Sequence, residues 1–246
     1  MVLAARLLRI PAALTEADAH LGLANRLAAP LARRVFLAYD IREGDNEKYR
    51  VTGRPVPRSH LGVGQAEGRV RLGLPAHGPV LAFFGALAGA QSLNDFAVAA
   101  YGETGPTVLH LTGERDYDSI RAQITRDDYL LMASTQDFGA ALAAPDLAIS
   151  RAGGTVWELA AAGTPSVLVP YPHATGDHQT ANALRFERGD GVVVVPEEEL
   201  DRVPALVEEL LADTDRLARM RQAMLSMARP NAADEIAEEL IALASA

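Results

Sequence analysis

The residues best suited to chemistry lie in the stretch SRAGGTVWELAAAGTPSVLVPYPHATGDHQTANA, residues 150–183. A predicted strand ends at Ser150, the first residue of this stretch. Gly153 and Gly154 then allow a tight turn before a helix that begins near Thr155. The first N–H groups of a helix have no partner inside it, so such a turn can bind phosphate. Glu158, one turn later, could accept hydrogen bonds from ribose hydroxyls. The alternative is an ordinary strand-to-helix turn with an acidic residue that stabilises the helix dipole.

Polar side chains gather in the loop after the next apolar run, SVLVP: His173, Asp177, His178, Gln179 and Asn182. Ligands of open α/β sheets bind beyond the carboxyl ends of the strands, so this loop is expected beside the glycine turn. His178 and Gln179 would begin the next helix and could contact a sugar or a phosphate. No metal site is predicted, because the spacing matches no common zinc pattern. A solvated loop histidine is the plainer alternative.

A second glycine turn occurs in FFGALAGAQSLN, where Gly85 and Gly89 precede another predicted helix. The spacing is not the G-x-G-x-x-G of a dinucleotide site. No Lys-Ser or Lys-Thr follows the glycines, and no G-x-S-x-G occurs, which excludes a Walker loop and a nucleophile elbow.

The elements that must position these turns alternate between short apolar runs and helical stretches, which predicts a doubly wound α/β fold with a parallel sheet. The predicted strands are Pro79 to Phe84, Thr107 to Thr112, Tyr129 to Ala133, Leu147 to Ser150, Ser166 to Pro170 and Val192 to Val195. Helices are predicted to begin near Leu93, Asp118, Gln136, Thr155, Asp177, Pro204 and Thr214, with a closing helix over Ala232 to Ala244.

The segment from Arg42 to Gly78 is rich in glycine, proline and charge, which predicts a domain junction. We expect residues 1–50 to form the end of one domain and a linker, and residues 51–246 to form a complete second domain. The first 41 residues contain two helices and strands at Ala12 to Leu14 and Val35 to Ala38, too little to close a core of their own.

Composition narrows the class of protein. Acidic residues outnumber basic ones by 32 to 23, for a formal net charge of −9, so broad attraction to nucleic acid is not expected. There are no cysteines, which excludes disulfides and thiolate chemistry and favours the cytoplasm. No apolar run approaches the roughly 20 residues of a membrane-spanning helix, and arginines interrupt the apolar start, unlike a secretory signal.

Several motifs occur together and in one order: TGRPVPR, FGALAGAQSLN, and DFGAALAAPDLAISRAGGTVWELAAAGTPSVLVPYPHATGDHQTANA, followed by a valine-rich strand. This succession resembles the donor domain of the MurG-type GT-B glycosyltransferases and covers nearly all of residues 50–246. Upstream, LTEADAHLGLANRLAAPLARRVFLAY resembles the last part of the acceptor domain of that family.

The resemblance implies two facing Rossmann-like domains, with UDP-N-acetylglucosamine on the C-terminal one and a lipid-linked peptidoglycan precursor on the other. It implies inverting transfer of N-acetylglucosamine without a metal or cofactor. Glu158 would hold the ribose, Gly153 and Gly154 would meet the diphosphate, His178 and Gln179 would contact the sugar, and the loop from Thr135 to Phe138 would frame the uracil. The donor-binding residues implied in this way are Arg58, Gly85, Gly89, Thr135, Arg151, Gly153, Gly154, Thr155, Glu158, His173, Asp177, His178, Gln179 and Asn182.

This sequence departs from the family pattern in three motifs. Leu87 and Ala88 replace a serine and a glutamine of the family's GGSQGA turn, and the arginine of its GNPVR motif is displaced to Arg58. The family's HEQN segment becomes Thr-Glu-Ala-Asp. Glu16, Asp18 and His20 are the candidates for acceptor-side catalysis, and a helix cap is the alternative for the two acids.

The family's opening G-G-x-G-G-H loop and its first βα units are absent from this sequence, so Met1 resembles the middle of a longer protein. One expectation is a glycosyltransferase that is peripheral on the inner face of the plasma membrane. A second is a donor-binding subunit, in which a separate polypeptide supplies the rest of the acceptor domain and contacts Met1 to Ile10 and Leu21 to Leu31. An inactive fragment, or a related transferase with another sugar or acceptor, is also consistent with the motifs.

Overall fold

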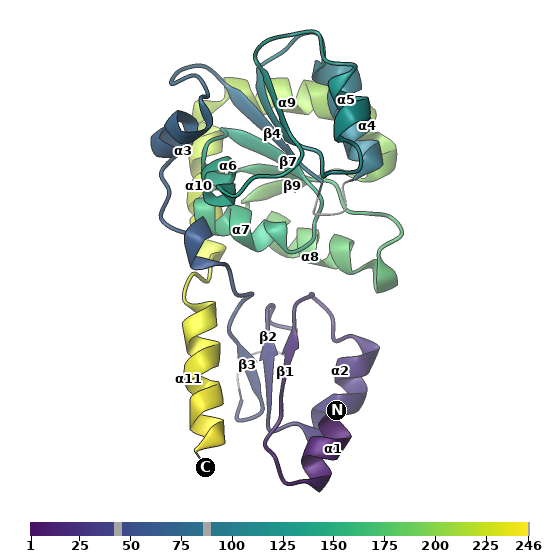
Figure 1. The fold of residues 1–246 in the computed structure, drawn as a ribbon, viewed down its shortest axis with the longest axis vertical. Helices are drawn as coiled ribbons and strands as arrows, with labels where there is room; N and C mark the ends of the chain where they lie inside the picture. Colours follow the sequence, from purple (N-terminus) through teal and green to yellow (C-terminus); the bar gives the residue numbers. More distant parts are fainter. Residues whose placement is uncertain (42–45, 86–89, 246) are drawn as a thin grey trace.

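The computed structural model describes residues 1–41, 46–85 and 90–245. Two parallel sheets lie one above the other in Figure 1, each with its own helices. We call residues 1–51 the small unit and residues 52–231 the large unit. The last helix leaves the large unit and runs beside the sheet of the small unit, as Figure 1 shows in yellow.

The large unit contains a six-stranded sheet in which every neighbouring pair is parallel, with the strand order β6-β5-β4-β7-β8-β9. This arrangement confirms the predicted doubly wound α/β fold. Its strands are β4 (Val80–Phe84), β5 (Thr107–Leu111), β6 (Tyr129–Met132), β7 (Leu147–Ser150), β8 (Ser166–Leu168) and β9 (Val192–Val194). All six were predicted within two residues at either end.

Helices cover both faces of this sheet because alternate strand residues point to opposite sides. Along β4, Val80, Ala82 and Phe84 pack in one core cluster, and Leu81 and Phe83 pack in another. The first cluster includes side chains of α6 (Phe138–Ala143), α7 (Thr155–Ala162), α8 (His178–Glu187) and α10 (Thr214–Met227), and the second includes those of α4 (Gln91–Tyr101) and α9 (Val203–Ala212). The short α5 (Tyr117–Arg121) follows β5. The predicted helices of this unit are therefore confirmed.

The predicted junction contains structure that the sequence did not indicate. Within it lie β3 (Tyr49–Val51), the 3-10 turn η2 (Arg58–His60) and α3 (Gln65–Leu72). Arg69 of α3 is buried, and its guanidinium donates to the carbonyl oxygens of Ala144, Ala76 and Gly78 and to the Asp146 carboxylate. Gln65 of α3 also donates to the Pro145 carbonyl and to Asp146, so the segment after β3 is packed against the rest of the large unit.

The small unit has a three-stranded parallel sheet in the order β1-β2-β3. Its elements are α1 (Val2–Leu7), β1 (Ala13–Glu16), α2 (Leu23–Ala28), η1 (Ala29–Leu31), β2 (Arg34–Leu37) and β3. The C-terminal helix α11 (Ala232–Ala244) is tied to this sheet by Glu239, which pairs with Arg34 at 3.0 Å and with Arg50 at 3.5 Å. Spatially, α11 therefore belongs with the small unit, although it ends the chain.

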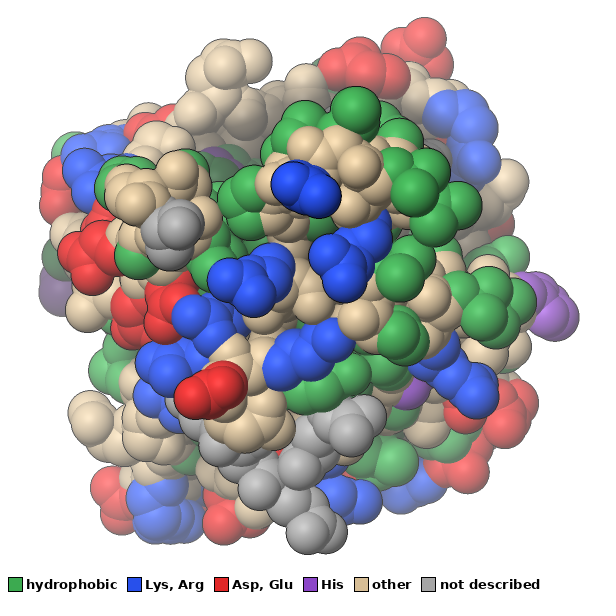
Figure 2. All heavy atoms as spheres, turned by 90° about the horizontal axis from the view of Figure 1, so that it is seen from below, with side chains coloured by type: hydrophobic (Ala, Val, Ile, Leu, Met, Phe, Trp, Pro, Cys, Tyr) green, Lys and Arg blue, Asp and Glu red, His purple; other side chains and the backbone are tan. Residues whose placement is uncertain are grey.

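One end of the small unit combines cationic and apolar side chains. Figure 2, seen from below, shows Lys and Arg side chains gathered on this end with hydrophobic side chains beside them. Arg6, Arg9, Arg26 and Arg33 are exposed there, together with the apolar side chains of Leu3, Leu7, Leu8, Ile10, Leu23 and Leu27. We call these ten residues the basic-apolar face. Across the described ranges, no helix combines the length and apolar character needed to cross a bilayer.

Candidate functional site

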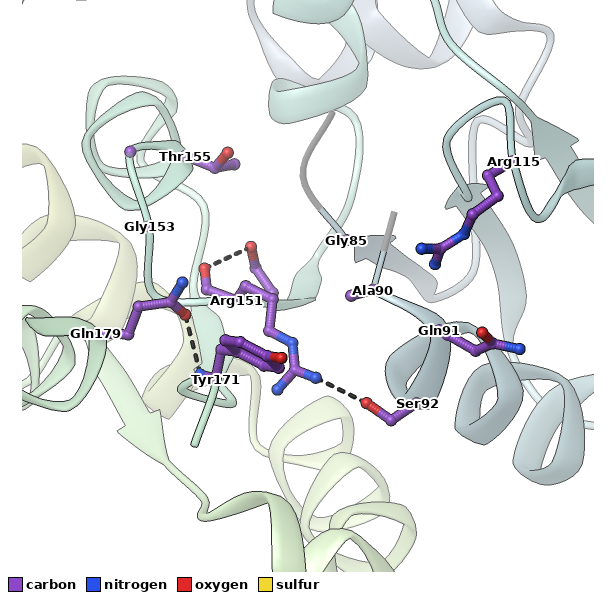
Figure 3. A pocket seen from close by; sticks show the side chains of 12 residues that line it. Gly85, Ala90, Gln91, Ser92, Arg115, Arg151, Gly153, Thr155, Tyr171 and Gln179 are labelled. Carbon is purple, nitrogen blue, oxygen red and sulfur yellow. Dashed lines mark hydrogen bonds between the residues drawn. The ribbon is translucent and has the colours of Figure 1, made fainter. Parts of the chain in front are cut away.

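A cleft of about 360 Å³ lies at the carboxyl edge of the six-stranded sheet (Figure 3). Because all the strands are parallel, the segments that follow β4, β5, β7 and β8 meet at this edge. Six predicted donor-site residues line the cleft: Gly85, Arg151, Gly153, Gly154, Thr155 and Gln179. The other lining residues are Ala90, Gln91, Ser92, Arg115, Ser150 and Tyr171.

Two helices begin at the cleft without a side-chain cap. The N-cap of α4 is Ala90 and that of α7 is Gly154, and neither makes a side-chain capping bond. Their first N–H groups and the positive ends of both helix dipoles therefore face the same space. A diphosphate is the kind of group that such a pair of helix ends can stabilise.

Gln179 reaches the cleft from the start of α8. Its Oε1 accepts a hydrogen bond from the backbone N–H of Tyr171 at 3.0 Å, which fixes the orientation of the amide (Figure 3). The amide nitrogen is then left on the cleft side with two N–H groups to donate. This geometry fits the predicted contact of Gln179 with a sugar or phosphate oxygen.

Arg151 lines the cleft, but its guanidinium is occupied by the protein. It donates to the carbonyl oxygens of Val169 and Pro170, donates to the Ser92 hydroxyl at 2.7 Å, and pairs with Glu197. Burial alone would raise the pKa of Glu197, but hydrogen bonds from Arg151 and Ser92 outweigh it and hold that pKa below its usual value. The arrangement gives Arg151 a positioning role, joining the ends of β7 and β8 to the start of α4.

Glu158 lies beside the cleft on the first turn of α7, where its Oε1 lies 3.0 Å from Nδ1 of His60. Both side chains are about four-fifths buried. The His60 ring meets the edge of Phe138 with 5.2 Å between centroids. His60 therefore connects Glu158, predicted to hold the ribose, with Phe138 of the loop predicted to frame the uracil. The sequence analysis did not identify His60. Thr135, in the same loop, accepts a hydrogen bond from the Asp137 backbone N–H.

The loop between β8 and α8 faces the small unit. His173 is exposed and packs its ring edge against Tyr171, and Asp177 adopts a left-handed backbone with φ of 53°. Nδ1 of His178 lies 2.8 Å from the Thr175 carbonyl oxygen, which can only accept, so Nδ1 is the donor. Asn182 is buried and bonds to the small unit, accepting from Ala19 N–H at 2.7 Å and donating to Asp18 Oδ1 at 3.1 Å.

The acceptor-side candidates occupy this same contact between the units. Glu16 is buried, and its carboxylate accepts from the Gly22 backbone N–H and the Asn25 amide, which holds the turn into α2. These hydrogen bonds reach the residue before α2 and a side chain within it, and no side chain caps the first turn of α2. His20 stacks on His178 with 6.2 Å between ring centroids, and its buried Nδ1 has no hydrogen-bond partner among the described residues.

The two arginines of the TGRPVPR motif, Arg54 and Arg58, lie in different places relative to the cleft. Arg58 is exposed and pairs at 2.6 Å with Asp234, at the start of α11, and it is not among the residues that line the cleft. Arg54 lies instead against the turn before α7, where a Cβ on Gly154 would come within 2.5 Å of the Arg54 guanidinium carbon. Gly89, like Leu87 and Ala88, lies outside the described residues.

A sequence profile of the glycosyltransferase family 28 C-terminal domain matches residues 80–238. The chain belongs to this family. As a family 28 glycosyltransferase it is similar to two UDP-N-acetylglucosamine--N-acetylmuramyl-(pentapeptide) pyrophosphoryl-undecaprenol N-acetylglucosamine transferases. That of Halothermothrix orenii is 34% identical over 94% of this chain and 67% of the relative. That of Nitratidesulfovibrio vulgaris is 38% identical over 98% of this chain and 68% of the relative.

Among solved structures, this family 28 chain is similar to MurG of Acinetobacter baumannii, with a TM-score of 0.78 and 26% identity. The match covers 96% of this chain and 68% of that one. The chain is thus a MurG-type hexosyltransferase with a GT-B fold, as the motifs predicted, and it spans about two thirds of the length of these relatives.

Proposed function

We propose that this chain binds UDP-N-acetylglucosamine in the cleft of the large unit and transfers the sugar, with inversion, to a lipid-linked N-acetylmuramyl-pentapeptide. The names of the relatives supply the substrates. The observation that carries the proposal is the convergence of two uncapped helix N-termini, those of α4 and α7, on one cleft. Such a site is suited to a diphosphate.

In the proposed reaction, an acceptor hydroxyl attacks the anomeric carbon while the bond from that carbon to the diphosphate oxygen breaks. UDP leaves with the bonding electron pair, and the N-termini of α4 and α7 stabilise the charge that develops on it. A base must take the proton of the hydroxyl. His20 is the candidate we retain for this base, because its Nδ1 is unpartnered within the described chain and it lies at the contact between the two units.

Calorimetry with UDP tests the donor site directly. We expect the parent protein to bind UDP and UDP-N-acetylglucosamine, and Glu158→Ala to weaken UDP binding about tenfold through loss of a charged hydrogen-bond acceptor. Glu208→Ala, an exposed acidic residue of α9, is the matched control. Equal UDP affinity in the Glu158 variant and the parent would sink the proposed placement of the ribose. A titration with UDP-glucose determines whether the site selects the N-acetyl group.

A second candidate is a donor-binding subunit that transfers sugar only with a separate polypeptide. The supporting observation is the exposure of the apolar side chains on α1 and α2, where Leu7 and Leu23 are 76% and 70% exposed. A transfer assay with and without the N-terminal third of the Nitratidesulfovibrio vulgaris relative tests this candidate. Activity that requires the added polypeptide supports it, and equal activity without it argues against it.

We further propose a cytoplasmic location, peripheral on the inner face of the plasma membrane, because the proposed acceptor is anchored in lipid. The basic-apolar face combines arginines with exposed leucines, which suits an anionic lipid surface. Sedimentation with vesicles containing phosphatidylglycerol is expected to retain the protein at low salt and to release it at high salt. Retention that does not depend on anionic lipid would contradict this part of the proposal.

A further inference from the structure

Among the described residues that line the cleft, Arg115 is the cationic side chain that still has donors to offer. The other arginine that lines the cleft, Arg151, is committed to Glu197, Ser92 and two carbonyl oxygens. Arg115 follows β5, and its side chain is about three-fifths exposed. In Figure 3 the guanidinium extends from the loop after β5 into the cleft. Gly85 and Ala90 border this side of the cleft, and Gly153 borders the opposite side.

Asp116 fixes this guanidinium from one side. Arg115 donates from Nε to Asp116 Oδ1 at 2.6 Å and from Nη2 to Oδ2 at 2.8 Å. An arginine has five N–H groups in a planar fork, so the Nη1 amino group and one N–H of Nη2 stay available. The Asp116 side chain itself is almost fully buried, so its carboxylate forms a rigid base for the fork.

A buried chain of polar side chains holds Asp116 in turn. The Asn94 amide donates to Asp116 Oδ2 at 2.9 Å and to the Thr112 carbonyl at 3.0 Å. With both N–H groups used, Asn94 offers only Oδ1 to Nε2 of His110, 2.9 Å away, so that ring nitrogen carries the proton. Burial lowers the pKa of His110 to about 3, so the ring is neutral and Nδ1 accepts from the Tyr129 hydroxyl at 2.8 Å.

The side chains of Tyr129, His110, Asn94 and Asp116 are joined by an unbroken series of hydrogen bonds that runs from the core to Arg115 at the cleft. Asn94, His110 and Tyr129 are each at least nine-tenths buried. A fully satisfied buried network is rigid, because any displacement leaves a polar group unpaired. We call the four residues Tyr129, His110, Asn94 and Asp116 the relay.

We infer that Arg115 binds the negative charge of the diphosphate in the cleft, and that the relay positions its guanidinium for this contact. The inference rests on the proposed function. It adds a specificity-determining residue, one that favours ligands with a negatively charged phosphate over ligands without one. In Figure 3, Arg115 and the start of α4 lie on one side of the cleft, and the turn before α7 lies on the other. Donors from opposite sides would therefore enclose the same oxyanion.

The test compares UDP with uridine, which has the same base and ribose but no phosphate. Calorimetric titrations with both ligands are made on the parent, Arg115→Gln, Arg115→Lys and the control Arg121→Gln, an exposed arginine of α5. We expect Arg115→Gln to weaken UDP binding about tenfold and to leave uridine binding unchanged. Arg115→Lys, which keeps the charge without the fork, should lie between the two, and Arg121→Gln should match the parent.

The relay is tested by Asn94→Ala, with thermal unfolding to verify that the variant is folded. We expect UDP affinity to fall about threefold while uridine affinity is retained, since only the aim of Arg115 changes. An equal loss for both ligands would show a merely structural role and overturn the relay.

The outcomes separate this inference from the proposed function. A parent protein that binds no UDP removes both. A parent that binds UDP, with Arg115→Gln binding it as tightly, leaves the proposed function in place and overturns the inference alone.

Discussion

The large and small units are both parallel α/β assemblies, but they bury their apolar side chains to very different extents. The sheet of the large unit is covered on both faces by two continuous core clusters, in which Leu81 and Phe83 are fully buried. The small unit has one cluster around Ala29, Val35 and Leu37, and many of its leucines remain exposed.

This difference corresponds to a division of tasks. Every described residue that lines the cleft comes from the large unit, so donor binding depends on the better-packed region. The acceptor-side candidates Asp18 and His20 belong to the small unit and contact Asn182 and His178 of the large unit. Donor binding should therefore tolerate changes in the small unit that would disturb transfer.

The largest expected effect is on the core of the large unit. Phe83 lies in β4 and packs against Phe96, Tyr101 and His110. Phe83→Ala should lower the free energy of unfolding by about 3–5 kcal/mol, because a large cavity is left in a close-packed site. Leu27→Ala in the small unit is the contrasting variant, with an expected change within about 0.5 kcal/mol, since Leu27 is 71% exposed. Urea unfolding followed by circular dichroism measures both, and similar losses would remove the contrast between the units.

The next effect is a pH dependence that originates in the large unit. The pKa of His110 is lowered from 6.5 to about 3 by burial, so the folded protein keeps the ring neutral while the unfolded chain binds a proton below pH 6.5. The contribution of His110 to stability is therefore unchanged above pH 7 and is lost progressively as the pH falls from 6.5 toward 3. Between pH 7 and pH 5 the loss should be about 2 kcal/mol.

Carboxylates also titrate as the pH falls, so His110→Gln provides the reference for this measurement. Glutamine keeps a polar side chain but takes up no proton in this range. Urea unfolding of both proteins at pH 7 and pH 5 should show the smaller decline in the variant. Identical declines would mean that His110 does not control this part of the pH profile.

The sequence predicted the six strands of the large unit because each is a short apolar run between glycine, proline or polar residues. It did not predict β3 and α3. The sequence of α3, QAEGRVRL, has no apolar stripe, because polar side chains hold this helix in place. Arg69 is buried and donates to carbonyl oxygens, and Gln65 donates to the Pro145 carbonyl and to Asp146. A buried arginine looks like a surface residue in the sequence.

The candidate site shows the same limit. Gly153, Gly154 and Gln179 were found because the turn and the helix start are local features of the chain. His60 and Arg115 were missed because their positions depend on contacts between segments distant in sequence, such as the 98 residues that separate His60 from Glu158. Arg58 was predicted as the donor-binding arginine, in preference to Arg54, from its spacing in the TGRPVPR motif. That spacing does not show which of the two side chains lies against the turn before α7.

A smaller effect is expected at the contact between the units. Asn182 bonds to Ala19 N–H, to Asp18 Oδ1 and to the Ala152 carbonyl. Asn182→Ala should cost about 1–2 kcal/mol in urea unfolding, because it leaves the Ala19 N–H and the Ala152 carbonyl without these partners. Asn231→Ala is the control, since Asn231 is exposed and makes no side-chain capping bond. A cost no larger than that of the control would show that the units are held by other contacts.

The smallest expected effect concerns the pair between Arg58 and Asp234, which links η2 of the large unit to α11. Both side chains are more than half exposed, at 81% and 53%, so water screens their attraction and the ordering of a long side chain offsets much of it. Arg58→Ala should change the free energy of unfolding by less than about 0.5 kcal/mol. It should also leave UDP affinity within a factor of about two, because Arg58 does not line the cleft. Arg54→Ala is the sharper companion variant, since the Arg54 guanidinium packs against the Gly154 turn and its loss should weaken UDP binding more. A marked loss of UDP affinity in Arg58→Ala, with none in Arg54→Ala, would reverse this assignment and restore the arginine that the motif spacing predicted.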